Sequence, residues 1–219
     1  MKHITAVIGL FFLFTVMAAN ANENADVFMH PLGAQTEASF KAAFQRLAEH
    51  PFIRGNFEQE KILGRLERSL KSSGNFIIAA EQGMVWDTVN PFPSTLVLGR
   101  DFLMQSRPGG QKNVLSAKGN ETFLRLADVI SAIFLGNANG LVHNFKVYYF
   151  GSSASWELGL VPLDRAINSF AQRIIMKGSE VIRYIEITEQ NGDSIKYIMS
   201  NHSFPAELNT SEQALFTLP

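Results

Sequence analysis

The fold is decided by residues 52–105, which read FIRGNFEQEKILGRLERSLKSSGNFIIAAEQGMVWDTVNPFPSTLVLGRDFLMQ. Short runs rich in branched and aromatic residues alternate here with Gly, Ser and Pro, a pattern typical of strands joined by tight turns. The spacing is regular, so we expect neighbouring strands to pair antiparallel in one sheet. The predicted strands cover residues 52–63, 66–71, 74–80, 84–89, 95–98 and 102–105.

A second group of strands follows later in the chain. Gly178-Ser179 and Asn191-Gly192-Asp193 have the composition of hairpin turns, because Gly and Asn tolerate the positive φ that such turns demand. The sheet is therefore expected to resume after an interruption. These later strands are predicted at residues 144–150, 155–161, 170–177, 181–189 and 194–201, with a short turn or helical piece at 164–169.

Helices are expected before, between and after the two groups of strands. The first begins after Thr36 and presents Phe40, Phe44 and Leu47 on one face until His50-Pro51 ends it, so it lies on the sheet. A short C-terminal helix is predicted to be capped by Ser211 and to cover residues 212–216.

The helix between the two groups of strands is predicted at residues 121–135 and is apolar on most of its circumference. Such a helix needs more than one apolar neighbour. It lies either between the sheet and a bound apolar ligand or between the sheet and another helix, and the sequence leaves both arrangements open.

The N-terminus has the pattern of a secretory signal peptide. Lys2 and His3 precede an apolar run over residues 4–19, and Ala19-Asn20-Ala21 is a small-residue cleavage site. A permanent membrane span is the weaker alternative, because no basic stop-transfer residues follow. We expect residues 1–21 to be removed on export and residues 22–219 to form a single domain, with no stable membrane insertion.

Composition excludes several classes of function. The chain has 19 basic and 20 acidic residues without a block of either sign, so nucleic acid is not an expected partner. It has no cysteine, which rules out disulfides, thiolate metal sites and a lipid-modified N-terminal Cys. Its 18 Phe residues indicate either a thick core or an apolar cavity with an occupant, and the sequence alone does not separate these.

The sequence contains no recognisable catalytic motif. His30, His50, His143 and His202 are isolated, without the spacing that would place two metal ligands on one helix face. The segment 151–155 contains three serines but lacks G-x-S-x-G spacing, so it is interpreted as a polar hairpin loop. We predict no catalytic residue, no metal and no cofactor, although residues distant in sequence can still meet in a fold.

An ordered set of short motifs follows the first group of strands. It consists of Phe57-Glu58-Gln59, Gly74 with Phe76, Met84-Val85-Trp86, Pro91, Leu96-Val97 and Leu103-Met104. In this order and spacing the chain resembles the LolA family of periplasmic lipoprotein carriers, in which an F-x-Q strand is followed by G-x-L, F-x-W, a Pro turn and an I-L-V strand.

The resemblance implies an α+β fold, namely a curved, unclosed antiparallel β-sheet or half-barrel with helices covering its concave face as a lid. It also implies a periplasmic carrier that holds the acyl chains of a lipoprotein or related lipidic cargo. Such a carrier works as a monomer between an inner-membrane exporter and an outer-membrane acceptor. Two alternatives stay open: an accessory binding module of an inner-membrane lipid exporter, and a lipid-ester hydrolase.

Two turns depart from the family pattern. Ala80-Glu81 replaces an Arg-Pro pair whose Arg holds the lid in the family, and Gly99-Arg100 replaces an Asp-Gly turn. With these changes the chain is more similar to divergent LolA-like proteins associated with lipid or aryl-polyene export. The predicted cargo-contacting residues are Phe76, Ile78, Ala80, Met84, Trp86, Leu96, Leu98, Ile130, Ile133 and Phe134.

Overall fold

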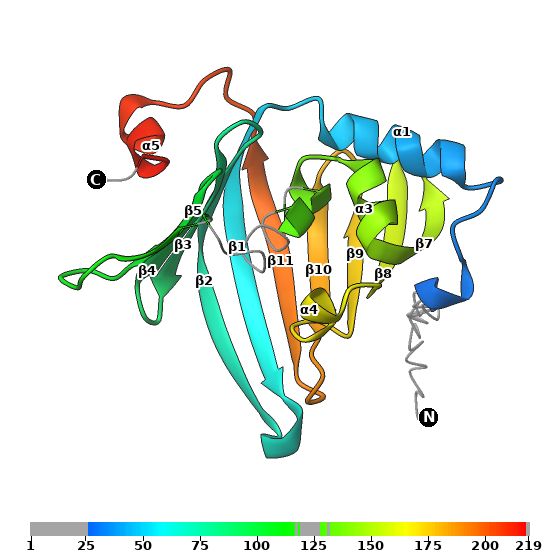
Figure 1. Ribbon diagram of the computed structural model, residues 1–219, viewed down its shortest axis with the longest axis horizontal. Coiled ribbons are helices and arrows are strands. Elements are labelled where there is room, and N and C mark those ends of the chain that lie inside the picture. Colours follow the sequence, from blue (N-terminus) through cyan, green and yellow to red (C-terminus); the bar gives the residue numbers. More distant parts are fainter. Residues whose placement is uncertain (1–25, 117, 119–127, 131, 218–219) are drawn as a thin grey trace, which may run out of the picture.

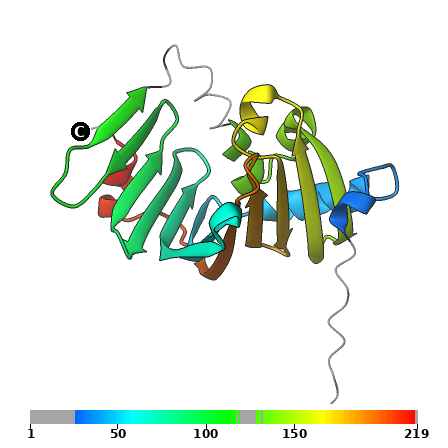
Figure 2. The same ribbon diagram turned by 90° about the horizontal axis from the view of Figure 1, so that it is seen from below.

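A computed structural model describes residues 26–116, 118, 128–130 and 132–217. Within them, one antiparallel sheet has the strand order β6-β5-β4-β3-β2-β1-β11-β10-β9-β8-β7. Figures 1 and 2 show that this sheet is curved and open, with most of its helices on the concave side. The predicted α+β half-barrel is therefore confirmed. The predicted signal peptide lies outside the described residues.

The strands agree with most of the predicted ranges. One strand and three short helical elements were not predicted: β6, η1 (Val27–Met29), η2 (Gly64–Leu66) and α3 (Ala138–Asn144). The strands are β1 (Phe52–Leu63), β2 (Arg68–Ala79), β3 (Gly83–Asn90), β4 (Ser94–Leu98), β5 (Phe102–Ser106), β6 (Asn113–Ser116), β7 (Phe145–Ser152), β8 (Ser155–Pro162), β9 (Arg173–Gly178), β10 (Ile182–Thr188) and β11 (Ser194–Ser203).

The predicted break within β2 is wrong. Residues 66–71 and 74–80 were expected as two strands, but β2 pairs with β1 continuously from Leu63↔Arg68 to Phe52↔Ala79. The turn-forming residues 72–74 are held extended by this long pairing, because the hydrogen bonds of a neighbouring strand outweigh local preference. The pairing of β2 with β3 does shift in register at these residues, between Ser73 and Gly74. Glycine is required there because an added Cβ would lie 1.9 Å from the carbonyl oxygen of Asp87.

The concave face of the sheet carries the main hydrophobic core. We define this face by Phe57, Phe76 and Met199, which alternate with outward-facing neighbours on their strands. Helix α1 (Glu37–Leu47) crosses one end of the sheet and buries the predicted Phe40, Phe44 and Leu47, together with Ala43. The short helices α3 (Ala138–Asn144) and α4 (Arg165–Asn168) also bury one residue each, Leu141 and Ile167.

The helix predicted at residues 121–135, which we call the inserted helix, lies only partly within the described residues. Residues 128–130 and 132–134 are helical, whereas 121–127 and 131 lie outside the described part of the chain. Ala132 packs against α3, because a Cβ built on Gly140 would lie 3.1 Å from the Cβ of Ala132. Of the two arrangements left open, the one between the sheet and other helices therefore holds for this part.

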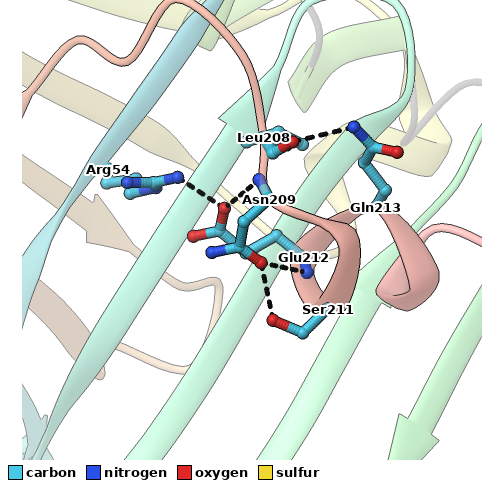
Figure 3. Close-up of polar contacts among 6 residues, drawn as sticks. All are labelled: Arg54, Leu208, Asn209, Ser211, Glu212 and Gln213. Atoms are coloured by element: carbon cyan, nitrogen blue, oxygen red, sulfur yellow. Dashed lines mark hydrogen bonds and ion pairs between the residues drawn. The ribbon is translucent and has the colours of Figure 1, made fainter.

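A second, smaller core lies on the convex face of β3, β4 and β5. Val85, Val97, Phe102 and Met104 form it, and Leu215 and Phe216 at the end of α5 (Thr210–Leu215) pack against it. The predicted cap Ser211 is wrong. Asn209 caps α5, since its side chain accepts from the Glu212 backbone N–H while Glu212 accepts from the Asn209 N–H, as Figure 3 shows.

Arg54 ties α5 to the sheet through an ion pair with Glu212. The Arg54 Nη2 to Glu212 Oε2 distance is 2.5 Å, and the two side chains are 34% and 15% exposed. We expect Arg54→Met to lower the free energy of unfolding by about 1–2 kcal/mol and to raise hydrogen exchange across residues 209–215.

The matched control for this prediction is Lys41→Met. The Lys41–Glu37 pair lies at the surface, with both side chains more than half exposed, so its loss should cost at most about 0.5 kcal/mol. Equal effects of the two substitutions would contradict a special role of Arg54 in holding α5.

Candidate apolar cargo site

Eight of the ten predicted cargo residues meet in one cluster on the concave face. Phe76, Ile78, Met84, Leu98 and Ile133 are buried in the main core, and Trp86, Ile130 and Phe134 are partly buried against it. Leu96 is partly buried and pairs with Trp86 across β3 and β4, but it lies outside this cluster. The strands and the inserted helix therefore bring together residues that are far apart in sequence.

Ala80 does not share the face of Phe76 and Ile78, so its predicted placement is wrong. The strand ends at Ala79, and Ala80 is exposed in the turn to β3. Its backbone N–H donates to the carbonyl of Pro51 at 2.9 Å, and Gln82 closes the turn onto Ala79. Strand alternation fixes side-chain direction only within a strand, and the turn redirects Ala80 outwards.

Trp86 is at the centre of an aromatic group that the sequence analysis only partly identified. Its ring stacks on Phe57 with centroids 4.1 Å apart, lies 6.0 Å from Phe76 and meets Tyr197 edge-on at 5.4 Å. Burial raises the pKa of Tyr197 to about 12, with a smaller contribution from the nearby charge of Glu189. Phe57 was quoted only as a motif residue, yet its alternation with the exposed Glu58 on β1 is the signal that could have placed it here.

Phe134 of the inserted helix borders a small cavity on the concave face. The cavity lies among Leu47, Ile53, Phe134, Val181, Met199 and His202, and its volume of about 10 Å³ is about that needed to hold one water molecule. Val181 and Ile182 can both be buried there because β10 has a register irregularity between Ile182 and Tyr184.

His202 borders this cavity and meets Phe76 edge-on, with ring centroids 5.6 Å apart. Burial lowers its pKa below 6.5, a hydrogen bond with the Ile182 backbone opposes the shift, and the charge of Arg183 adds to it. Because the unfolded chain binds a proton more readily, stability should fall as the pH drops below 6.5, by at most about 1.4 kcal/mol per pH unit.

Urea midpoints measured across this pH range test the prediction. His202→Asn should remove part of the pH dependence, whereas the exposed His143 replaced by Asn should leave it intact. An unchanged profile in His202→Asn would contradict the assignment.

The remaining polar candidates are dispersed over the surface. The ring of His30 lies tilted against Phe150, and His50 stacks on Phe204. Residues 151–155 span the end of β7, the turn at 153–154 and the start of β8. Within the described ranges, no group of three or more His, Asp or Glu residues is placed to hold a metal ion. No helix among these residues is long and apolar enough to cross a membrane.

A family model described as outer membrane lipoprotein carrier protein LolA matches residues 51–217. The chain belongs to the LolA family. The sequence-based resemblance is thereby confirmed, as a divergent member of a family of carrier proteins that bind lipid or lipoprotein. A search of curated protein sequences yields no match.

Several solved structures resemble the chain at low sequence identity. A LolA superfamily protein, NE2245 from Nitrosomonas europaea, is 10% identical with a TM-score of 0.48, covering 85% of this chain and 98% of its own. A DUF1329 family protein from Desulfovibrio piger is 10% identical with a TM-score of 0.46, covering 83% and 97%. LprF from Mycobacterium bovis is 8% identical with a TM-score of 0.36, covering 83% and 98%.

The two turns that depart from the LolA pattern lie next to each other. The Nε–H of Arg100, in the turn after β4, donates to the backbone carbonyl of Glu81, in the turn after β2. Both side chains are largely exposed at this edge. An arginine is thus bonded to a backbone carbonyl at this end of the sheet, and this bond joins two turns. The contacts that place residues 129, 130 and 132–134 in the core are apolar.

Proposed function

We propose that this LolA-family chain is a periplasmic carrier that binds the acyl part of lipoproteins or related lipidic cargo and moves it towards the outer membrane. The observation that carries the proposal is the apolar group around Trp86 on the concave face, which belongs to one hydrophobic cluster with Val129, Ile133 and Phe134 of the inserted helix. An apolar surface of this kind, with the inserted helix packed against it by apolar side chains, is suited to binding a hydrocarbon chain.

The energetics favour exchange of the helix for cargo. Each buried methylene contributes about 0.8 kcal/mol, so one long acyl chain supplies on the order of 10 kcal/mol before the costs of binding. Part of this is spent in moving Ile133 and Phe134 off the sheet, which keeps the net affinity low enough for release. The small cavity beside Phe134 marks a place where the packing is already incomplete.

The remaining features of the role follow from the sequence. Residues 1–21 direct export, residues 22–219 act as one monomeric domain, and the cargo passes from an inner-membrane exporter to an outer-membrane acceptor. The carrier needs no cofactor, and its contact residues are the eight clustered side chains together with Leu96, whose partner Trp86 lies within the group.

Gentle purification followed by lipid extraction and mass spectrometry tests this function. We expect stoichiometric recovery of an acyl-bearing molecule, and binding of a fluorescent fatty-acid probe once that molecule is removed. Trp86→Ser should weaken probe binding by at least about tenfold, since Trp86 is a partly buried aromatic of the sheet itself and its contact with the acyl chain is lost.

Phe216→Ser is the matched control, because Phe216 is a partly buried phenylalanine of the convex core. It should leave probe binding unchanged. Absence of both a co-purifying lipid and probe binding would overturn the carrier role. Steady hydrolysis of ester substrates, abolished by a single Ser or His substitution, would replace it with an enzymatic one.

A further inference from the structure

One end of the sheet exposes large apolar side chains on several separate connections. Leu66 and Leu70, on the hairpin between β1 and β2, are 64% and 59% exposed, and Leu163 and Phe170, on either side of α4, are 64% and 55% exposed. In the antiparallel order, β1, β8 and β10 end here while β2, β9 and β11 begin. We call these four residues with their neighbouring loops the tip surface.

Hydrogen bonds join the loops of the tip surface into one unit. The Gly64 N–H donates to Asp193 Oδ1 at 3.0 Å, which fixes the β1–β2 hairpin to the turn between β10 and β11. The side chain of Gln190 in that turn donates to Asn168 of α4 at 2.7 and 2.9 Å. Figure 1 shows η2 and this turn at the lower end of the sheet, with α4 above the turn.

The β1–β2 hairpin extends well beyond β3 on one side, and β11 accompanies it almost to the end of β1 on the other. The pairing of β2 with β3 begins only at Ser73, and that of β1 with β11 ends at Ile62. Residues 68–72 therefore project past β3 by about 17 Å, at roughly 3.3 Å per residue. Pairing with β1 continues to Leu63↔Arg68, so one edge of the projecting segment is hydrogen-bonded, while the edge beyond β3 stays open to water or to polar lipid headgroups.

The charges at the tip surface favour an anionic partner. Arg65, Arg68 and Arg165 are exposed there. The nearby acids are largely engaged: Glu189 pairs with Lys61 at 2.9 Å, Asp193 accepts from the loop backbone, and the side chain of Asp164 caps α4. Glu67 is the one exposed acid among the charged residues named here, so the charged side chains that this end presents to solvent are mainly arginines.

We infer that the tip surface docks the protein on the surface of an anionic lipid bilayer. Single leucines and a phenylalanine on separate loops insert at the level of the headgroups, while the arginines beside them pair with lipid phosphates. A protein partner would instead be expected to require a continuous packed patch. The inference goes beyond carriage of cargo, because it concerns the protein with or without a bound lipid.

Co-sedimentation with lipid vesicles tests the inference on the protein recovered after export. Vesicles of phosphatidylcholine and phosphatidylglycerol in equal amounts should bind the chain, and salt should weaken this binding, whereas phosphatidylcholine alone should bind it much less. Leu66→Ser combined with Phe170→Ser should lower the partition coefficient at least about tenfold. Arg65→Ser combined with Arg68→Ser should lower it by about fivefold per arginine, on the anionic vesicles only.

Phe204→Ser combined with Arg183→Ser is the matched control. Both residues are exposed near the opposite end of the sheet, where β11 ends and β10 begins, so this variant should bind vesicles like the unchanged chain. No vesicle binding, or binding that the tip substitutions leave intact, would overturn the inference. The same variants should bind the fatty-acid probe normally; loss of probe binding in the unchanged chain would refute the carrier role and leave the membrane inference standing.

Discussion

The Phe57→Ala variant is expected to lose about 3–5 kcal/mol of its free energy of unfolding. Phe57 is 1% exposed and stacks on Trp86, with ring centroids 4.1 Å apart. Removing its ring leaves a void beneath Trp86 on β1, a central strand paired on both sides, where the backbone has little freedom to collapse. Urea unfolding should therefore show a large fall in the midpoint with an unchanged slope.

Two further substitutions separate packing from other causes. Phe57→Leu keeps most of the volume and should cost less than about 1.5 kcal/mol. Phe92→Ala removes a ring that is 82% exposed in the turn between β3 and β4, so it should change stability by no more than about 0.5 kcal/mol. A loss in Phe57→Ala as small as that in Phe92→Ala would mean that the concave core is not packed as described.

The Gly136→Ala variant is expected to lose about 2–4 kcal/mol and to loosen the cover over the concave face. Gly136 follows the inserted helix with a φ of 70°, and an added Cβ would lie 2.2 Å from the carbonyl oxygen of Phe44 in α1. The positive φ strains any residue with a Cβ, and the Cβ also collides with the backbone of α1. The collision cannot be relieved easily, because a helix backbone cannot move aside as a flexible side chain can. Binding of the apolar dye ANS should rise as the helix is pushed from α1.

Gly109→Ala is the control for this second prediction. Its φ of 69° is nearly the same, but nothing lies within 4 Å of the added Cβ, so only the conformational cost of about 1–2 kcal/mol remains. The difference between the two variants therefore measures the contact of Gly136 with α1. Equal losses, with no rise in ANS binding for Gly136→Ala, would show that this contact does not hold the cover in place.

The candidate site was largely predictable wherever strands were long and alternating. Phe76, Ile78, Met84 and Leu98 were placed correctly, since a period of two fixes which side chains share a face. Ala80 was misplaced at the end of such a run, where a single residue separates strand from turn. Tyr197 was missed, because nothing in its neighbourhood indicates that β11 lies beside β1.

The amino-acid sequence by itself determined the antiparallel meander, the apolar first helix and membership of the LolA family, because these depend on local periodicity and on ordered motifs. Only the tertiary structure decided that β2 runs unbroken through Ser72-Ser73-Gly74, that α5 is held by Arg54, and that three separate loops form one apolar and basic tip. These features depend on pairings between residues far apart in the chain, whose energies exceed local preference and leave no periodic signal in the sequence.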